Sequence, residues 1–195
     1  MKRTPPRLFK AALLLSLAAV TVDAQQEFTI GTVAGCDCSQ PNLGDGGPAK
    51  AAQITADAVA LDTAGNLYIA DTGNNRIRKV STNGTISTVA GNGLLSFSAA
   101  GDGGPALVAE LGNPSGVAVD AAGDIYISDF ESARIRKVTS DGTIRTVAGG
   151  GDGTCSGSQT NSIGDGCPAV NAKLGLPYGI ALDAAGNLYI ILRIP

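Results

Sequence analysis

A phrase of about two dozen residues that the chain repeats is the feature that most limits its possible folds. The phrase runs from Asp57 to Val80, returns from Ser115 to Val138, and begins again at Tyr178. Equivalent tyrosines recur at intervals of 58 and 63 residues: Tyr68, Tyr126 and Tyr189. A unit of this length, with insertions in one place only, is typical of a propeller or solenoid and not of a globule with a single core.

Each full unit divides into four strand candidates separated by turn residues. In the first unit they are residues 58–61, 67–70, 76–80 and 85–90, and in the second unit residues 116–119, 125–128, 134–138 and 143–148. Four short strands joined by tight turns predict an all-β fold in which each unit is one antiparallel meander. The T-V-A-G ending of both units also occurs at residues 32–35, which predicts that residues 25–35 hold the final strand of a preceding unit.

Aspartate and glycine recur at the predicted hairpins, where Asp accepts backbone hydrogen bonds and Gly takes positive φ. We expect these residues to be structural turn formers and not catalytic groups: Asp62, Gly65, Asp120, Gly123, Asp183 and Gly186. The dipeptides Asn83-Gly84 and Asp141-Gly142 predict two-residue hairpins before the last strand of each unit. The carboxylates of the repeat are therefore explained by turns, and we expect no catalytic residue.

A second motif, G-D-G-G-P-A, precedes each phrase, at residues 44–49 and 101–106 and as G-D-G-C-P-A at 164–169. Its aspartates could bring carboxylates to a calcium ion together with backbone carbonyls. Gly-Asp-Gly is equally ordinary turn chemistry, and no glutamate follows at a fixed offset. We expect no metal site, with these residues as weak candidates: Asp45, Asp102 and Asp165. A helical turn is expected after Pro105 and Pro168.

Strands such as V-A-V and L-Y-I carry apolar residues on both flanks, which indicates that neighbouring sheets cover both of their faces. The small residues Ala60, Ala118 and Ala181 are expected near a crowded axis. The third strands carry six basic residues, which we interpret as a solvated face with cross-strand partners in preference to an anion site: Arg76, Arg78, Lys79, Arg134, Arg136 and Lys137.

Residues 1–24 have the pattern of a secretory signal peptide. Four basic residues precede an apolar segment at 11–22, and a small-residue cleavage site ends at Ala24. The apolar segment is too short to span a bilayer as an anchor. The pattern predicts a secreted or periplasmic protein with no membrane span after signal removal. Without the leader, 10 basic and 16 acidic residues remain, and this acidic balance disfavours nucleic acid as a partner.

Four cysteines in an exported chain predict disulfides more than metal ligands. Cys155 and Cys167 bracket a loop of 13 residues, and closing it would remove about 3 kcal/mol of unfolded-state freedom. We expect these two to pair. Cys36 and Cys38 could form a strained bridge with each other, pair with the other insertion, or mark a soft metal site.

The motifs G-D-G-G-P-A, G-V-A-V-D-A-A-G and N-L-Y-I-A-D-T-G-N-N-R-I-R-K-V, with the closing T-V-A-G, resemble those of NHL-repeat β-propellers of the secreted bacterial type. The resemblance covers residues 28–190. It implies four-stranded antiparallel blades, commonly six in a ring, with blades at 57–91 and 115–149, a last strand at 25–35 and the start of a truncated blade at 178–195. The third copy departs from the motif at Ile191. We therefore expect residues 25–195 to be a fragment of a longer propeller, with two full and two partial blades.

The same resemblance implies a scaffold whose members serve as binding platforms, as sensors and in a few cases as enzymes. We expect an exported, non-enzymatic interaction module for a protein, peptide or glycan, without a cofactor and with possible self-association through open blade edges. The alternatives are a metal-assisted hydrolase or lyase and a truncated product with no independent function. The chain contains no histidine and no G-x-S-x-G motif, which disfavours the hydrolase.

Overall fold

The computed structural model describes residues 30–36, 43–154 and 166–193. The chain divides into two compact units, residues 1–32 and 33–195. In the first unit, the described residues 30–32 form no regular element. The expected signal peptide at residues 1–24 lies outside the described residues, and so do Cys38, Cys155 and Asp165.

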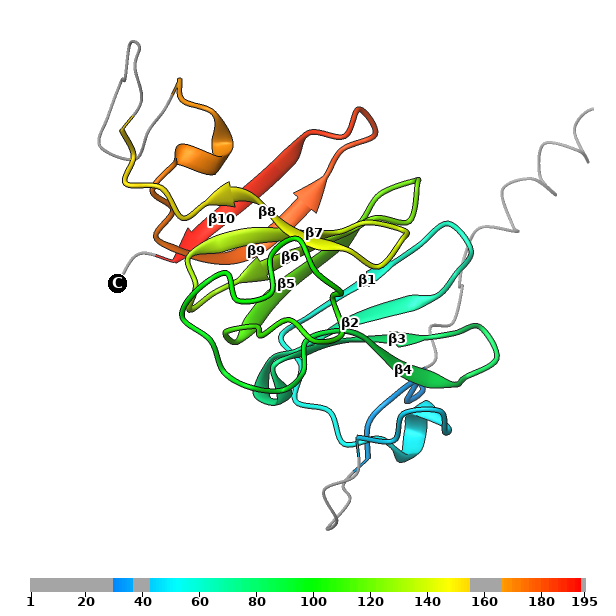
Figure 1. Cartoon of the computed structure of the whole chain (residues 1–195). Helices are drawn as coiled ribbons and strands as arrows, with labels where there is room; N and C mark the ends of the chain where they lie inside the picture. Colours follow the sequence, from blue (N-terminus) through cyan, green and yellow to red (C-terminus); the bar gives the residue numbers. More distant parts are fainter. Residues whose placement is uncertain (1–29, 37–42, 155–165, 194–195) are drawn as a thin grey trace, which may run out of the picture. The chain divides into compact units, whose positions relative to one another are not determined.

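The second unit consists of antiparallel sheets that follow one another along the chain (Figure 1). The first sheet has the order β1 (Ala58–Leu61), β2 (Leu67–Asp71), β3 (Arg76–Val80) and β4 (Ile86–Ala90). The second has the order β5 (Pro114–Val119), β6 (Ile125–Asp129), β7 (Arg134–Val138) and β8 (Ile144–Gly149). The third pairs β9 (Leu176–Leu182) with β10 (Leu188–Arg193). Three short 3-10 turns accompany them: η1 (Ala49–Ala51), η2 (Thr72–Asn74) and η3 (Ala169–Asn171).

The eight strands predicted for the two full units are present, with bounds that differ from the prediction by two residues at most. Of the final strand predicted at residues 25–35, residues 25–29 lie outside the described residues, and residues 30–35 with the first T-V-A-G form no strand. In the full sheets this ending pairs with the third strand, as Ala90 does with Ile77. Residues 33–36 pair with no such strand in the described part of the second unit, and the N–H of Gly35 donates instead to the carbonyl of Ala49 at 3.0 Å.

One kind of hairpin turn recurs throughout the sheets. At the first hairpin, the N–H of Asp62 donates to the carbonyl of Asn66 and the N–H of Gly65 to the carbonyl of Asp62, both at 3.0 Å. Gly65 has φ +83°, which completes a three-residue loop with a left-handed third position. Residues 81–85, 120–124, 139–143 and 183–187 repeat this bonding. The predicted two-residue hairpins at Asn83-Gly84 and Asp141-Gly142 are therefore wrong, because each glycine is the third residue of a longer loop.

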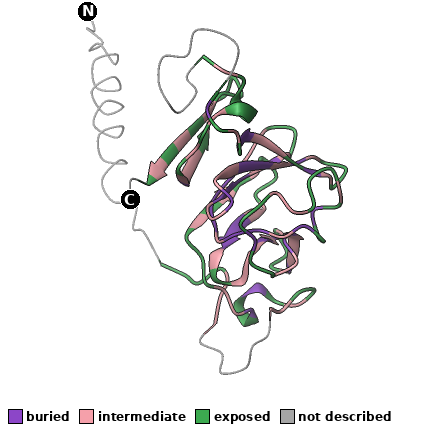
Figure 2. Ribbon diagram, turned by 60° about the vertical axis from the view of Figure 1, so that its left-hand side comes forward, coloured by how far each residue is buried: buried purple, intermediate pink, exposed green. Residues whose placement is uncertain are grey.

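The second sheet is the most buried part of the molecule (Figure 2). One apolar cluster joins Ala60 and Tyr68 of the first sheet to Val117, Ile125 and Ile127 of the second. Strands β1, β5 and β9 contact one another in that order, so the innermost strands of successive sheets are neighbours. The prediction that strands are covered on both faces is confirmed for the second sheet.

The first and third sheets both expose apolar side chains of a strand to solvent, although in the first sheet Ala49 and Ala52 of the preceding loop cover Ile69, Val80 and Ile86. Val59 and Leu61 of β1 are 62% and 65% exposed, and Ile191 of β10 is 67% exposed. Ala181 is also exposed, whereas Ala118 is buried. For these two sheets the prediction that neighbouring sheets cover both faces is wrong. Among the described residues, each of them has a neighbouring sheet on one side only.

Strands β5 and β9 approach so closely that glycine is required between them. A Cβ atom on Gly116 would lie 2.6 Å from the carbonyl oxygen of Tyr178. The hydroxyl of Ser115 donates to the carbonyl of Pro177 at 3.0 Å and so joins the two strands. Small side chains at the start of the innermost strand therefore set the spacing between successive sheets.

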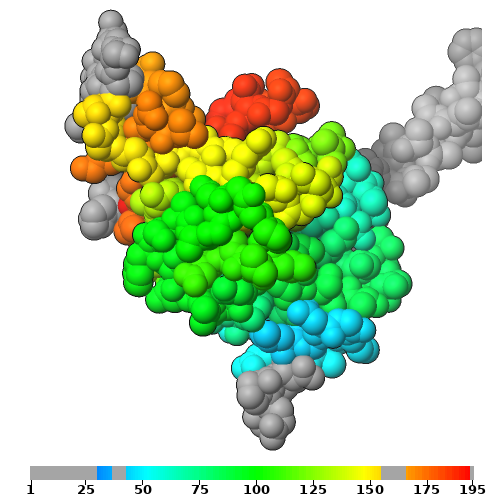
Figure 3. All heavy atoms as spheres, in the orientation of Figure 1, coloured from blue at the N-terminus to red at the C-terminus, as the bar shows by residue number. Residues whose placement is uncertain are grey.

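The first two G-D-G-G-P-A loops each cover the outer edge of the four-stranded sheet that follows them in the chain. The N–H of Gly46 donates to the carbonyl of Ile86 at 2.8 Å, and that of Gly103 to the carbonyl of Ile144 at 2.7 Å. Figure 3 shows the connecting segment between β4 and β5 (residues 91–113), in green, on the same face as the yellow strand β8. An edge strand covered in this way cannot pair freely with another chain.

The helical turn expected after Pro168 is present as η3. After Pro105 there is a single turn, in which the N–H of Val108 donates to the carbonyl of Pro105. Over the described residues, no helix has both the length and the apolar character needed to cross a membrane.

Candidate functional site

Two arginines of the third strands are completely buried between aspartates. In the first sheet, the guanidinium of Arg78 is 3.2 Å from Asp71 Oδ2 on one side and 2.7 Å from Asp45 Oδ1 on the other. The side chains of Arg78 and Asp71 are 0% exposed, while that of Asp45 is 46% exposed. The solvated face predicted for the third strands is wrong at this position, because the G-D-G-G-P-A loop folds over Arg78 and supplies a second counter-ion.

The second sheet repeats this Asp–Arg–Asp arrangement. Arg136 is also 0% exposed and lies 3.2 Å from Asp129 and 2.7 Å from Asp102. Burial raises the pKa of Asp129, while hydrogen bonds from the N–H of Gly112 and from Arg136 act in the opposite direction. Each set links the loop before a sheet, the third strand of that sheet and the end of its second strand.

The inner aspartate also holds the segment that leads into the sheet. Asp71 Oδ1 accepts a hydrogen bond from the N–H of Thr55 at 2.8 Å, and Asp129 Oδ1 accepts one from the N–H of Gly112 at 2.6 Å. One buried carboxylate therefore neutralises an arginine and satisfies a backbone donor at the same time.

The weak metal candidates Asp45 and Asp102 each lie against a guanidinium. The second oxygen of Asp45 accepts a hydrogen bond from the hydroxyl of Thr88 at 2.7 Å. Among the described residues, no three or more His, Cys, Asp or Glu side chains gather in a group that could hold a metal ion.

The hairpin aspartates direct their carboxylates at their own turns. Asp62 Oδ1 accepts hydrogen bonds from the N–H groups of Ala64 at 3.0 Å and Asn66 at 2.8 Å. Hydrogen bonding, first from the side chain of Asn66, lowers the pKa of Asp62. Asp120 and Asp183 make the same backbone contacts in the later hairpins. These carboxylates are hydrogen-bond acceptors already occupied by local donors.

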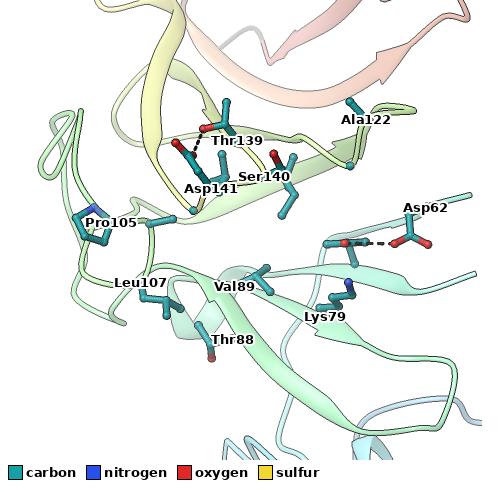
Figure 4. Close-up of a pocket in the computed structure, with 16 residues that line it drawn as sticks. Asp62, Lys79, Thr88, Val89, Pro105, Leu107, Ala122, Thr139, Ser140 and Asp141 are labelled. Carbon is teal, nitrogen blue, oxygen red and sulfur yellow. Dashed lines mark hydrogen bonds between the residues drawn. The ribbon is translucent and has the colours of Figure 1, made fainter. Parts of the chain in front are cut away.

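A cleft of about 630 Å³ opens between the first and second sheets. Figure 4 shows Lys79 and Val89 on the side of the first sheet and the hairpin at residues 139–142 on the opposite side. The connecting segment adds the half-exposed side chain of Leu107. The volume lies in the range of small-ligand sites, and the mixture of apolar wall and few polar groups is typical of them.

Lys79 lines this cleft and lacks the ion pair that the equivalent lysine of the second sheet makes. The equivalent Lys137 donates to Asp124 Oδ2 at 2.7 Å, and this hydrogen bond raises the pKa of Lys137 to about 12. In the first sheet Asn66 occupies the position of Asp124. The ammonium of Lys79 lies 5.3 Å from the centre of the Tyr68 ring and forms no ion pair within 4.0 Å with any described carboxylate. Its N–H donors are therefore available to a ligand.

A smaller hollow of about 270 Å³ lies where β5 and β9 begin. Phe130 and Tyr178 line it and contact each other edge to face, with ring centroids 6.4 Å apart. Sequence reasoning anticipated neither hollow. The one available signal was the difference between Asn66 and Asp124 in otherwise matching repeats.

The four-stranded antiparallel sheets, packed through their innermost strands, define the protein as a β-propeller of four-stranded blades. A family model described as "NHL repeat" matches residues 57–80, and a model described as "Teneurin NHL domain" matches residues 94–154. Residues 57–80 thus match an NHL repeat and residues 94–154 a teneurin NHL domain, and both ranges lie in or beside the two four-stranded sheets. The relationship expected from the motifs is confirmed.

Two curated relatives illustrate the similarity. The chain is 42% identical to human Teneurin-4 over 93 residues, which are 42% of this chain and 3% of the relative. It is 37% identical to Teneurin-3 of Danio rerio over 141 residues, which are 66% of this chain and 5% of the relative. The chain thus spans only a small part of the length of these relatives.

One solved structure supports the fold. An auxiliary nutrient binding protein from Bacteroides ovatus superposes with a TM-score of 0.50 at 23% identity, covering 68% of this chain and 33% of that one. At this identity the similarity bears on the propeller fold alone.

Proposed function

We propose that this protein is a non-enzymatic binding module that holds its ligand in the cleft between the first two blades, taken as residues 57–91 and 115–149. The observation that carries the proposal is the pairing of an open cleft of about 630 Å³ with Lys79, a lysine that lacks an ion-pair partner among the described residues. The repeated aspartates are engaged in turns and in pairs with buried arginines, so they are poorly placed for acid–base or metal chemistry.

The wider setting is also part of the proposal. The signal-peptide pattern at residues 1–24 supports a secreted or periplasmic location. The likeness to NHL-repeat domains supports a scaffold for recognition, with a protein, peptide or glycan as partner, because propellers present loops and clefts on a rigid frame. The pairing of Cys155 with Cys167 remains a prediction that fits an oxidising compartment.

Two tryptophan substitutions on one loop test whether the cleft is the binding site. Leu107 lines the cleft and is 56% exposed, whereas its neighbour Val108 is 63% exposed and does not line it. The full chain would be screened against an array of neutral and acidic oligosaccharides and peptides. We expect Leu107→Trp to block binding of any hit and Val108→Trp to leave it unchanged. Equal effects of the two substitutions, or no hit at all, would overturn the proposal.

A further inference from the structure

We infer that the cleft between the first two blades binds an acidic sugar of the hexuronic acid class, whose carboxylate pairs with Lys79. This inference rests on the proposed function and names the ligand of the same site.

The second blade shows what the ammonium of this lysine requires. There the ammonium of Lys137 pairs at 2.7 Å with the carboxylate of Asp124, which directly precedes the neighbouring strand β6. In the first blade, Asn66 directs its amide to Asp62 Oδ2 at 2.7 Å and offers no charge to Lys79. Asp62 interacts with Lys79 electrostatically but forms no ion pair with it within 4.0 Å, so the half-buried ammonium can still pair with a carboxylate of a ligand. A ligand carboxylate would thus take the place that Asp124 holds in the second blade.

The other charges of the cleft limit how much negative charge the ligand can carry. Asp62 and Asp141 also line the cleft, so two protein carboxylates accompany one lysine. Hydrogen bonds lower the pKa of both aspartates, and they are anionic at neutral pH. A densely sulfated or phosphorylated chain would be repelled. A sugar ring with one carboxylate and several hydroxyls meets this constraint.

The hydrogen-bonding groups of the cleft also suit hydroxyls. Asp141 Oδ1 accepts from the hydroxyl of Thr139 at 2.6 Å and the N–H of Thr143 at 3.0 Å. Asp141 is exposed, and a carboxylate has further acceptor sites that can receive a sugar hydroxyl. Val89 and Leu107 supply apolar wall for the C–H face of a ring.

A peptide fits these features less well. Peptides commonly add a strand to an open sheet edge or insert an apolar anchor. The outer strand β4 is already covered by the loop that contains Gly46. The aromatic ring nearest to Lys79, that of Tyr68, is only 4% exposed and offers little surface to an anchor side chain.

Calorimetric titration of the full chain with a galactose trisaccharide that carries a single galacturonic acid residue, and with uncharged galactotriose, tests the inference. We expect the acidic trisaccharide to bind about tenfold more tightly, as one charge-assisted hydrogen bond allows, and the difference to shrink with added salt. Lys79→Met should abolish this preference. Asn66→Asp should also abolish it, because it supplies the internal counter-ion found in the second blade. The matched control, Lys137→Met, should retain it.

Each outcome separates the two proposals. Binding of neutral sugars that Leu107→Trp blocks but Lys79→Met does not affect would contradict the uronic acid and leave the binding cleft standing. Lys79-dependent binding of a tetrapeptide with one glutamate, with no binding of the mono-acidic trisaccharide, would show that the ligand is an acidic peptide and overturn the sugar class. Absence of any ligand sensitive to Leu107→Trp would remove both proposals.

Discussion

Replacing Asp71 with alanine is expected to destabilise the first blade strongly, because it removes the buried counter-ion of Arg78. Arg78 is 0% exposed, and it would keep only the carbonyl of Leu43 and the 46% exposed carboxylate of Asp45. Breaking a buried ion pair by removing one member costs about 3–5 kcal/mol. Loss of the acceptor for the N–H of Thr55 adds about 1 kcal/mol. We therefore expect Asp71→Ala to lower the free energy of unfolding by about 4 kcal/mol or more.

Asp45→Ala is the matched comparison, because it removes the exposed partner of the same arginine. A half-exposed ion pair contributes about 1 kcal/mol or less. The double substitution Asp71→Leu with Arg78→Met removes both buried charges and should recover much of the stability that Asp71→Ala loses, since a well-packed apolar pair often replaces a buried ion pair without net cost.

Urea unfolding followed by far-ultraviolet circular dichroism measures these differences through the midpoint and the slope of the transition. A lower midpoint with an unchanged slope would indicate loss of stability of the whole cooperative unit. A lower slope would indicate that the first blade unfolds separately, as repeat proteins allow. Equal and small effects of Asp71→Ala and Asp45→Ala would refute the buried Asp–Arg–Asp arrangement.

Three further expectations follow from the same structure. The hydrogen bond with Asp124 raises the pKa of Lys137 from 10.5 to about 12. Its stabilising contribution is therefore complete below pH 10.5 and is lost as the pH rises towards 12. Lys137→Met should abolish this part of the alkaline loss of stability in thermal melts. Hydrogen bonding to Asn187 lowers the pKa of Asp183, so its contribution is present above the unfolded pKa and lost as the pH falls through the lower folded value; Asp183→Asn should make acid unfolding of the third sheet less steep. Gly116→Ala should cost about 1–3 kcal/mol by overpacking against Tyr178, whereas Gly175→Ala, where a Cβ meets nothing within 4 Å, should melt within a degree or two of wild type.

The strands and their hairpins could be predicted from the sequence because their signals are local. Five consecutive residues such as Asp62 to Asn66 contain the donors, the acceptor and the glycine that one turn needs. The burial of Arg78 could not be predicted in this way, since its second partner Asp45 lies 33 residues earlier and reaches it only when the loop folds over the sheet. For the same reason the sequence did not predict that the G-D-G-G-P-A aspartates pair with buried arginines.

The cleft depends on the spacing of two sheets, which no local pattern reports. Its charge could have been anticipated by comparing repeats position by position, because Asn66 replaces Asp124 while Lys79 and Lys137 are kept. The first T-V-A-G predicted a strand that residues 30–36 do not form. In the two full sheets this ending is a strand because it pairs with the third strand of its own sheet.

Thermal unfolding of the full chain with calcium and with a chelator tests most directly whether the repeated aspartates serve the fold and not a metal. An ion that binds the folded state raises the melting temperature with its concentration. With Asp45 and Asp102 paired to buried arginines, we predict the same melting temperature in both conditions. A saturable rise with calcium that Asp102→Ala removes would contradict this account.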